Sequence, residues 1–138
     1  MTMGEEEVME VTRQLGSRLK PFDVVMGPVV TGKQYFKSVF SRIDRATHPV
    51  IVETHAQAVE SFAAHLPEGG KGMNNDYDPH LSLAYGDLED GVRETVKGLA
   101  EQAHVEGMKC RVAEIQVWST EGLVKDWKQT GTVTMTGS

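Results

Sequence analysis

The chain has 138 residues, of which 39% are hydrophobic and 25% charged, and its formal net charge is −6. This length predicts one domain, residues 1–138, and the composition argues against disorder. The negative charge repels nucleic acid and anionic lipid, so we expect no DNA binding. No apolar stretch is long enough to span a membrane, and the acidic residues 5–7 are unlike a secretory signal, which favours a cytoplasmic location.

Hydrophobic periodicity and turn residues divide the chain into eight predicted elements. The predicted helices cover residues 5–20, 50–66 and 88–103. The predicted strands cover residues 22–30, 34–43, 80–85, 109–119 and 125–135. A turn at residues 31–33 is expected to join the first two strands. The order of the elements indicates an α+β domain with helices packed on a largely antiparallel sheet.

The sequence offers no pattern typical of a metal or cofactor site. Residues 68–79 are rich in Gly, Asn and Asp and predict a loop, but they lack the later Glu of a calcium site. His48 and His55 are seven residues apart, with Pro49 between them and no third ligand evident. The single cysteine, Cys110, excludes an intramolecular disulfide. We therefore expect no metal ion and no cofactor.

The predicted strand at residues 80–85 carries the residues best suited to chemistry. Side chains alternate along a strand, so His80 and Ser82 are expected to share one face, with Leu81 and Leu83 in the core. Histidine titrates in the range that a general acid or base requires, and a Ser hydroxyl stabilises a phosphate oxygen that gains negative charge. H-x-S is a weak pattern by itself, so a hydrogen-bonded structural histidine is the alternative interpretation.

The neighbouring sequence extends this pattern into a family resemblance. Residues 75–88, NDYDPHLSLAYGDL, resemble the second H-x-[ST]-x signature of the two-histidine phosphoesterases, in particular the plant and yeast cyclic phosphodiesterases. Residues 30–40 resemble the family's Thr-Gly turn and the aromatic strand after it. Residues 108–117 and 127–133 resemble its two closing strands. The likeness covers almost the whole chain in the family's order.

The resemblance implies a two-lobed fold and a metal-independent cyclic phosphodiesterase of RNA or tRNA splicing metabolism. Its substrate would be a small cyclic phosphate nucleotide, either ADP-ribose 1″,2″-cyclic phosphate or a nucleoside 2′,3′-cyclic phosphate. The resemblance also implies that His80 is one of two catalytic histidines, that Ser82 binds a phosphate oxygen and that Tyr85 lies close to the pocket.

Two residues of the aromatic segment are further candidates for substrate binding. Lys37 brings positive charge to an anionic substrate. Tyr35 either stacks on a base or belongs to the core, and the core is the favoured interpretation. Alternation is expected to place Tyr35 and Lys37 on one side of the strand, and Phe36 and Phe40 on the other.

The chain departs from the family at its first motif. The family's first H-x-T strand lies ahead of its first helix, and here that helix begins almost at Met1. The other histidines, His48, His55, His65 and His104, have no Ser or Thr two residues later.

This departure leaves three explanations open. Upstream residues are missing from this sequence, two chains combine to complete a site, or the protein is a non-catalytic relative that binds phosphorylated nucleotides or a protein partner. A missing strand would leave a sheet edge uncovered, which invites pairing with another chain. We therefore hypothesise a homodimer formed through that edge.

Overall fold

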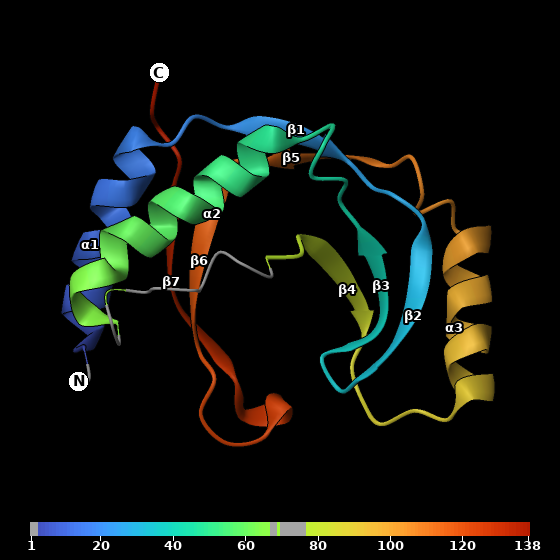
Figure 1. The fold of residues 1–138 in the computed structure, drawn as a ribbon. Coiled ribbons are helices and arrows are strands. Elements are labelled where there is room, and N and C mark those ends of the chain that lie inside the picture. The colour runs from blue at the N-terminus through green and yellow to red at the C-terminus, as the bar shows by residue number, and fades with distance from the viewer. Residues whose placement is uncertain (1–2, 67–68, 70–76) are drawn as a thin grey trace. The chain divides into compact units, whose positions relative to one another are not determined.

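The computed structural model describes residues 3–66, 69 and 77–138. In chain order they form α1 (Glu5–Arg18), β1 (Phe22–Val25), β2 (Val29–Gln34), β3 (Lys37–Arg42), α2 (Pro49–Phe62), η1 (Ala63–His65), β4 (His80–Ala84), α3 (Asp90–Gln102), β5 (Lys109–Val112), β6 (Glu114–Ser119), η3 (Val124–Asp126) and β7 (Lys128–Thr134) (Figure 1). The pairs β2–β3, β3–β4 and β6–β7 are antiparallel. The predicted α+β class, with largely antiparallel pairing, is confirmed.

The chain divides into two compact units, in agreement with the two-lobed fold that the resemblance implies. The first comprises residues 1–22, 53–76 and 112–138, and the second comprises residues 23–52 and 77–111. The assignment of residues 1–138 to one domain stays a prediction. Among the described helices, none is long and apolar enough to cross a membrane.

In the first unit, α1 packs against the β6–β7 pair (Figure 1). The helix carries acidic residues in its first turn and Arg18 in its last, which suits the helix dipole. It buries Leu15 and Gly16, and a Cβ at Gly16 would lie only 2.5 Å from the Val133 side chain. A Cβ at Gly131 would likewise collide with Met9. These two glycines therefore allow the helix and β7 to approach closely.

In the second unit, the three-stranded sheet has the order β2-β3-β4, and a separate ladder joins β1 to β5. This order places β4 at an edge of the sheet. Helix α3 packs mainly against β2 and β3, so it leaves β4 largely uncovered (Figure 1). Buried apolar residues of this unit are Val24, Met26, Val29, Val39, Phe40 and Ile43. The burial of consecutive β3 residues, including Ser38 and Ser41, indicates that β3 is the central strand of the core.

The predicted turn at residues 31–33 is wrong, because β2 continues to Gln34 and the turn consists of Tyr35 and Phe36. Gly32 lies inside the strand, where a Cβ would collide with the backbone oxygen of Lys37. The β2–β3 register shifts between Thr31 and Gln34, as in a β-bulge. Gly32 therefore marks a close approach of two strands, which is the other common reason for a glycine in a strand.

Several predicted boundaries need correction. The strand predicted at residues 125–135 begins only at Lys128, because Val124–Asp126 forms the 3-10 helix η3, and the helix predicted at residues 50–66 ends at Phe62 and continues as the 3-10 helix η1. The three predicted helices are confirmed as α1, α2 and α3. The strand predicted at residues 22–30 is interrupted at residues 26–28, which contain Gly27 and Pro28. The strand predicted at 109–119 is interrupted at Ala113, so β5 and β6 belong to different sheets. Most of the loop predicted at residues 68–79 lies outside the described residues.

Replacing Gly27 with Ala should destabilise the protein. Its N–H donates to the Arg42 carbonyl at 2.7 Å, and an added Cβ would lie 2.6 Å from that same oxygen. Since a backbone carbonyl cannot move aside cheaply, we expect the free energy of unfolding to fall by about 1–3 kcal/mol in urea denaturation.

The matched control is Gly98→Ala on α3, where an added Cβ meets no heavy atom within 4 Å. Alanine stabilises a helix interior by up to about 1 kcal/mol relative to glycine, so this variant should be at least as stable as the wild type. Equal stability of Gly27→Ala and the wild type would contradict the close contact at Gly27.

Candidate active site

Strand β4 holds His80 and Ser82 against β3. His80 lies opposite Arg42, and Ser82 lies opposite Phe40. The next pair joins Ala84 to Val39, so Leu83 is the extra residue of a β-bulge. The structure thus brings the imidazole and the hydroxyl of the H-x-S pattern to neighbouring positions on an edge strand, at a point where a bulge changes the direction of the chain.

A backbone contact fixes the His80 ring. Its Nδ1 lies 2.6 Å from the carbonyl oxygen of Asp78. A carbonyl oxygen only accepts hydrogen bonds, so Nδ1 must carry the proton, and in the neutral ring Nε2 is then the acceptor. This arrangement suits a general base, because the ring is oriented from one side and takes up a proton on the other.

Phe40 forms the wall behind the imidazole. The two rings meet edge to face, with centroids 5.5 Å apart. Two cations lie over the same phenyl ring: the Lys37 Nζ is 5.7 Å and the Arg42 Cζ is 5.4 Å from its centroid. Positive charge therefore gathers beside His80 on a chain whose net charge is −6.

Asp78 links these cations to the histidine. Its carboxylate lies 2.8 Å from the Lys37 Nζ and 3.5 Å from the Arg42 Nε. Burial by itself raises the pKa of the Asp78 carboxyl, but the hydrogen bond from Lys37 and the neighbouring positive charges, including that of His80, outweigh burial and leave the pKa below its ordinary value of 3.8. Asp78 therefore holds Lys37 with its side chain and His80 with its backbone.

The Ser82 hydroxyl is held weakly. Its Oγ donates to the carbonyl oxygen of Phe36 across 3.4 Å, near the upper limit for a hydrogen bond. Residues 82–85 also line an open pocket of about 310 Å³ along the edge strand. This hydroxyl can turn toward a ligand, because breaking such a long hydrogen bond costs little free energy.

Three exposed aromatic rings gather beside this pocket, and we call them the aromatic cluster: Tyr35, Phe36 and Tyr85. Phe36 meets Tyr35 at 5.0 Å and Tyr85 at 5.4 Å, both edge to face. Tyr35 is 42% exposed, so the favoured interpretation of this residue as part of the core is wrong. Its position in the two-residue turn gives the reason, since a turn residue has neighbours on fewer sides than a strand residue.

Buried polar contacts hold the cluster in place. Arg93 on α3 donates from Nε to the Ser38 Oγ at 3.0 Å, and that hydroxyl donates to the Gly86 carbonyl at 3.0 Å. The Gly86 N–H donates to the carbonyl oxygen of Tyr35 at 2.8 Å. Because Gly86 directly follows Tyr85, this chain of bonds ties the end of β4 to the turn that carries Tyr35.

Two expectations about side-chain direction are wrong. Leu81 is 41% exposed instead of buried, because α3 covers β2 and β3 and leaves the edge strand open. Lys37 lies over Phe40, whereas simple alternation separated the two. The register of β3 shifts against both of its neighbours, and regular alternation does not hold across such shifts.

Asp78 is the site residue that sequence reasoning missed. Its position among Asn and Asp residues indicates a turn, and nothing in that composition reveals a partner 41 residues away in sequence, at Lys37. The available signal is its spacing, two residues ahead of His80 at the entry to the strand, where a backbone carbonyl can reach the imidazole.

The remaining histidines have other surroundings. His48 accepts a hydrogen bond from the Val25 N–H at Nε2, and His65 lies 3.6 Å from Glu7. His104 is exposed and has a φ of 57°. Within residues 3–66, 69 and 77–138, no group of three or more His, Cys, Asp or Glu side chains is placed to hold a metal ion.

Comparison with known proteins assigns the family. The model of the cyclic phosphodiesterase-like protein family matches residues 6–135. The chain belongs to this family. Membership supports a phosphoesterase, and therefore a hydrolase, role in general, and confirms the relationship inferred from the H-x-S segment.

A solved structure supports the fold independently. The crystal structure of TT0787 of Thermus thermophilus is similar to this chain, with a TM-score of 0.64 and 14% sequence identity. The similarity covers 99% of this chain and 74% of that protein. No curated protein sequence matches the chain. At this identity the structural likeness supports the fold alone.

Replacing Asp78 with Asn should make stability less sensitive to acid. The variant keeps the carbonyl that binds His80 and loses the carboxylate that binds Lys37, so we expect unfolding at pH 7 to cost about 1 kcal/mol less. Because the folded-state pKa of Asp78 is lowered, its contribution is complete above pH 3.8 and disappears as the pH falls further. Denaturation midpoints of the two proteins should therefore converge in acid.

Asp87→Asn is the matched control, since Asp87 is exposed and lies just after β4, whereas Asp78 lies just before it. It should follow the wild type at every pH. A stability difference for Asp78→Asn that persists unchanged to pH 2 would show that the Asp78 charge contributes nothing.

Proposed function

We propose that this chain is a metal-independent cyclic phosphodiesterase that hydrolyses a nucleoside 2′,3′-cyclic phosphate or ADP-ribose 1″,2″-cyclic phosphate. His80 is the proposed general acid or base, and Ser82 and Lys37 are the proposed phosphate ligands. One observation carries the proposal: an imidazole fixed at Nδ1 by a carbonyl stands beside a weakly held hydroxyl and a cation, within a chain of the cyclic phosphodiesterase-like family.

The chemistry of ring opening accounts for each of these groups. Water attacks the phosphorus atom, the bond from phosphorus to one ribose oxygen breaks, and the leaving oxygen takes a proton, so the product is a phosphate monoester. The His80 Nε2 would take the proton from water or, when protonated, give one to the leaving oxygen. The Ser82 hydroxyl and the Lys37 ammonium would stabilise the phosphate oxygens as their charge grows.

The mechanism needs a second group for the other proton transfer, and the sequence offers no second H-x-S or H-x-T histidine for it. None of the four other histidines is followed two residues later by Ser or Thr. Loss of one acid or base usually costs about 10²–10⁴ in rate, so the chain by itself is expected to be slow. The hypothesis of a homodimer that completes a site stays a prediction, as do the cytoplasmic location and a role in RNA or tRNA splicing metabolism.

The aromatic cluster supports a nucleotide as the substrate. Tyr35 and Tyr85 are 42% and 43% exposed, and Tyr85 lines the same pocket as Ser82. A rigid exposed ring that is held beside a phosphate-binding hydroxyl can stack on a base. We therefore propose that the base of the substrate lies on this cluster while its cyclic phosphate lies at His80 and Ser82.

His80→Asn should abolish hydrolysis of adenosine 2′,3′-cyclic phosphate. Asparagine keeps a side-chain donor for the Asp78 carbonyl but cannot transfer protons near neutral pH, so kcat should fall by about 10²–10⁴ with little change in stability. The measurement is product formation by chromatography, alongside thermal unfolding of both proteins.

His104→Asn is the matched control, because His104 is exposed and its positive φ is tolerated by asparagine. It should keep wild-type turnover. If the wild type binds the cyclic nucleotide without hydrolysing it, the non-catalytic nucleotide-binding alternative is favoured. Equal turnover by His80→Asn and the wild type would refute the role of His80.

Tyr35→Ala should weaken binding of the base without affecting the reacting phosphate. Loss of one stacking partner costs about 1–3 kcal/mol, so KM for adenosine 2′,3′-cyclic phosphate should rise by about fivefold or more. Glycerol 1,2-cyclic phosphate has no base, and its kcat/KM should be unchanged. A parallel loss with both substrates would show that Tyr35 acts on the fold instead of the base.

A further inference from the structure

The three residues before β4 determine where the His80 ring lies, and we call residues 77–79 the leading segment. The Asp78 carbonyl in this segment lies 2.6 Å from the His80 Nδ1. A hydrogen bond weakens steeply when its atoms move out of line, so the direction of this carbonyl sets both the tautomer and the orientation of the imidazole. Whatever holds the leading segment in place therefore also holds the histidine.

The C-terminal end of the leading segment is fixed by Pro79. This residue is buried, and its ring fixes its own φ and restricts the conformation of Asp78 before it. The Pro79 carbonyl accepts the Ile43 N–H at 3.0 Å, which attaches the segment to the chain directly after β3. The freedom left to the Asp78 carbonyl therefore depends on how the other end of the segment, at Tyr77, is held.

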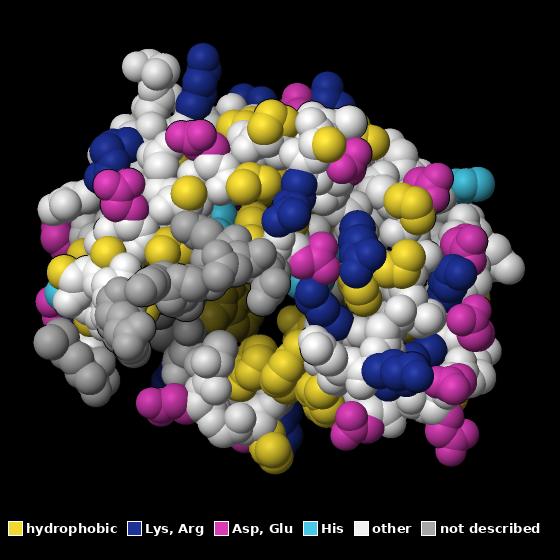
Figure 2. Space-filling model, viewed as in Figure 1, with side chains coloured by type: hydrophobic (Ala, Val, Ile, Leu, Met, Phe, Trp, Pro, Cys, Tyr) yellow, Lys and Arg dark blue, Asp and Glu magenta, His cyan; other side chains and the backbone are white. Residues whose placement is uncertain are grey.

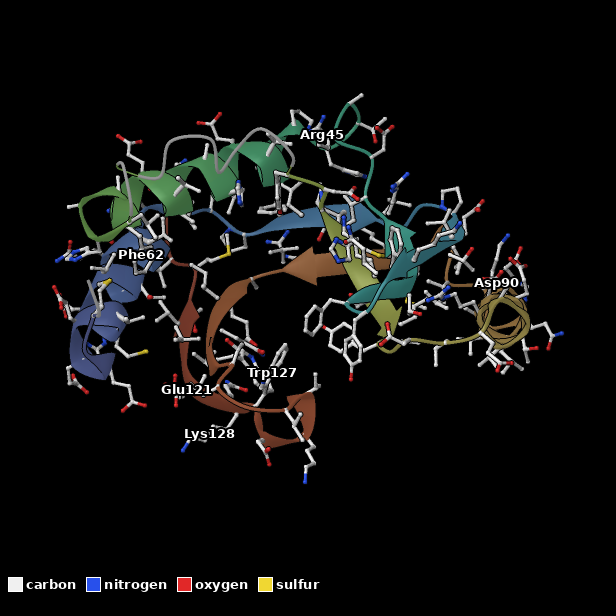
Figure 3. The ribbon with its side chains drawn as sticks, turned by 60° about the horizontal axis from the view of Figure 1, so that its bottom comes forward. Arg45, Phe62, Asp90, Glu121, Trp127 and Lys128 are labelled. Atoms are coloured by element: carbon white, nitrogen blue, oxygen red, sulfur yellow. The ribbon has the colours of Figure 1, made fainter. Side chains whose placement is uncertain are left out.

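Arg45 holds that other end. Its Nη1 donates to the Tyr77 carbonyl at 2.9 Å, and a hydrogen bond from a charged donor is stronger than one from a neutral donor. Figure 3 shows Arg45 on the segment between β3 and α2. That turn is itself held by Asp44, whose carboxylate accepts the Ala46 N–H and whose carbonyl accepts the His48 N–H, both at 3.0 Å. The guanidinium therefore extends from a well-supported turn.

The charges around Arg45 favour a structural use of its guanidinium. Arg42, Asp44, Arg45 and Asp78 all line one hollow of about 490 Å³. Two positive and two negative side chains balance there, so the lining has no net charge with which to attract an anion. A bond to a main-chain carbonyl, in contrast, positions the chain whatever the charge of the surroundings is.

We propose that Arg45 is a positioning residue for His80. It fixes the Tyr77 carbonyl while the Ile43 N–H fixes the Pro79 carbonyl, and the Asp78 carbonyl between these two anchors is thereby kept directed at the His80 Nδ1. The kinetic consequence rests on the proposed function, whereas the effect on the imidazole does not depend on turnover.

The first test is heteronuclear NMR of the histidine ring nitrogens at about pH 9, where an imidazole of ordinary pKa is neutral. In the wild type, His80 should carry its proton at Nδ1, with a large shift difference between its two nitrogens. In Arg45→Ala this difference should shrink, because the Nε2–H tautomer becomes populated when the carbonyl is no longer held in line. An unchanged difference would overturn the inference.

His48 provides an internal control in the same spectra. Its Nε2 accepts the Val25 N–H at 3.2 Å, and it lies three residues from Arg45 without bonding to the leading segment. Its signals should stay unchanged in Arg45→Ala. An equal change at His48 and His80 would show that Arg45 supports its own turn instead of the leading segment, and would also overturn the inference.

Two further variants separate the contact from a general loss of charge. Arg45→Lys keeps a charged donor and should restore most of the wild-type difference at His80. Arg111→Ala removes an exposed guanidinium of β5, in the same unit, that binds Asp23 instead of the leading segment. It should leave the His80 signals unchanged, and a loss equal to that of Arg45→Ala would contradict the proposal.

The second test measures hydrolysis of adenosine 2′,3′-cyclic phosphate. In Arg45→Ala, kcat should fall by about tenfold and KM should change by less than about twofold, because the imidazole is misdirected while the groups that bind phosphate remain. A raised KM with unchanged kcat would overturn the inference and identify Arg45 as a substrate contact. If the wild type does not hydrolyse this compound, the proposed function fails, and the NMR comparison alone decides the role of Arg45.

Discussion

The backbone carbonyl of Asp78 holds the His80 ring, and the arrangement of the candidate site depends on this contact. It decides which ring nitrogen carries the proton. The carboxylate of the same residue lies next to Lys37 and Arg42. A single residue thereby sets the tautomer of the histidine with its main chain and positions the surrounding cations with its side chain.

Local charge at the site is opposite in sign to the charge of the whole chain. The net charge of the chain is −6, and Figure 2 shows Lys and Arg side chains interspersed with Asp and Glu on the face in view. Around His80 the balance differs, because Phe40 provides a ring over which two cations lie and Asp78 neutralises only one of them. A small anion responds to such a local field within a few ångströms, while a long polyanion responds to the whole surface.

Periodicity predicted most of the fold, and it failed where strands are irregular. The three helices and the α+β class followed from apolar spacing, since a helix buries one face whatever its partner is. The sequence predicts Gly32 as a turn residue, whereas in the structure Gly32 allows the backbones of β2 and β3 to approach closely. The directions of Lys37 and Leu81 were also missed, because register shifts and an edge position change what a side chain meets.

By itself, the sequence determined which chemical groups are available, through the H-x-S pattern of His80 and Ser82 and the family resemblance around it. Both are local features, because residues two positions apart on a strand remain close together whatever the rest of the chain does. Only the tertiary structure decided what surrounds these groups. The contacts of Asp78 with Lys37, of Phe40 with His80 and of Arg93 with Ser38 join positions far apart in the chain. Such contacts depend on strand register and helix packing, which are set by how the whole core excludes water, and no short segment encodes them.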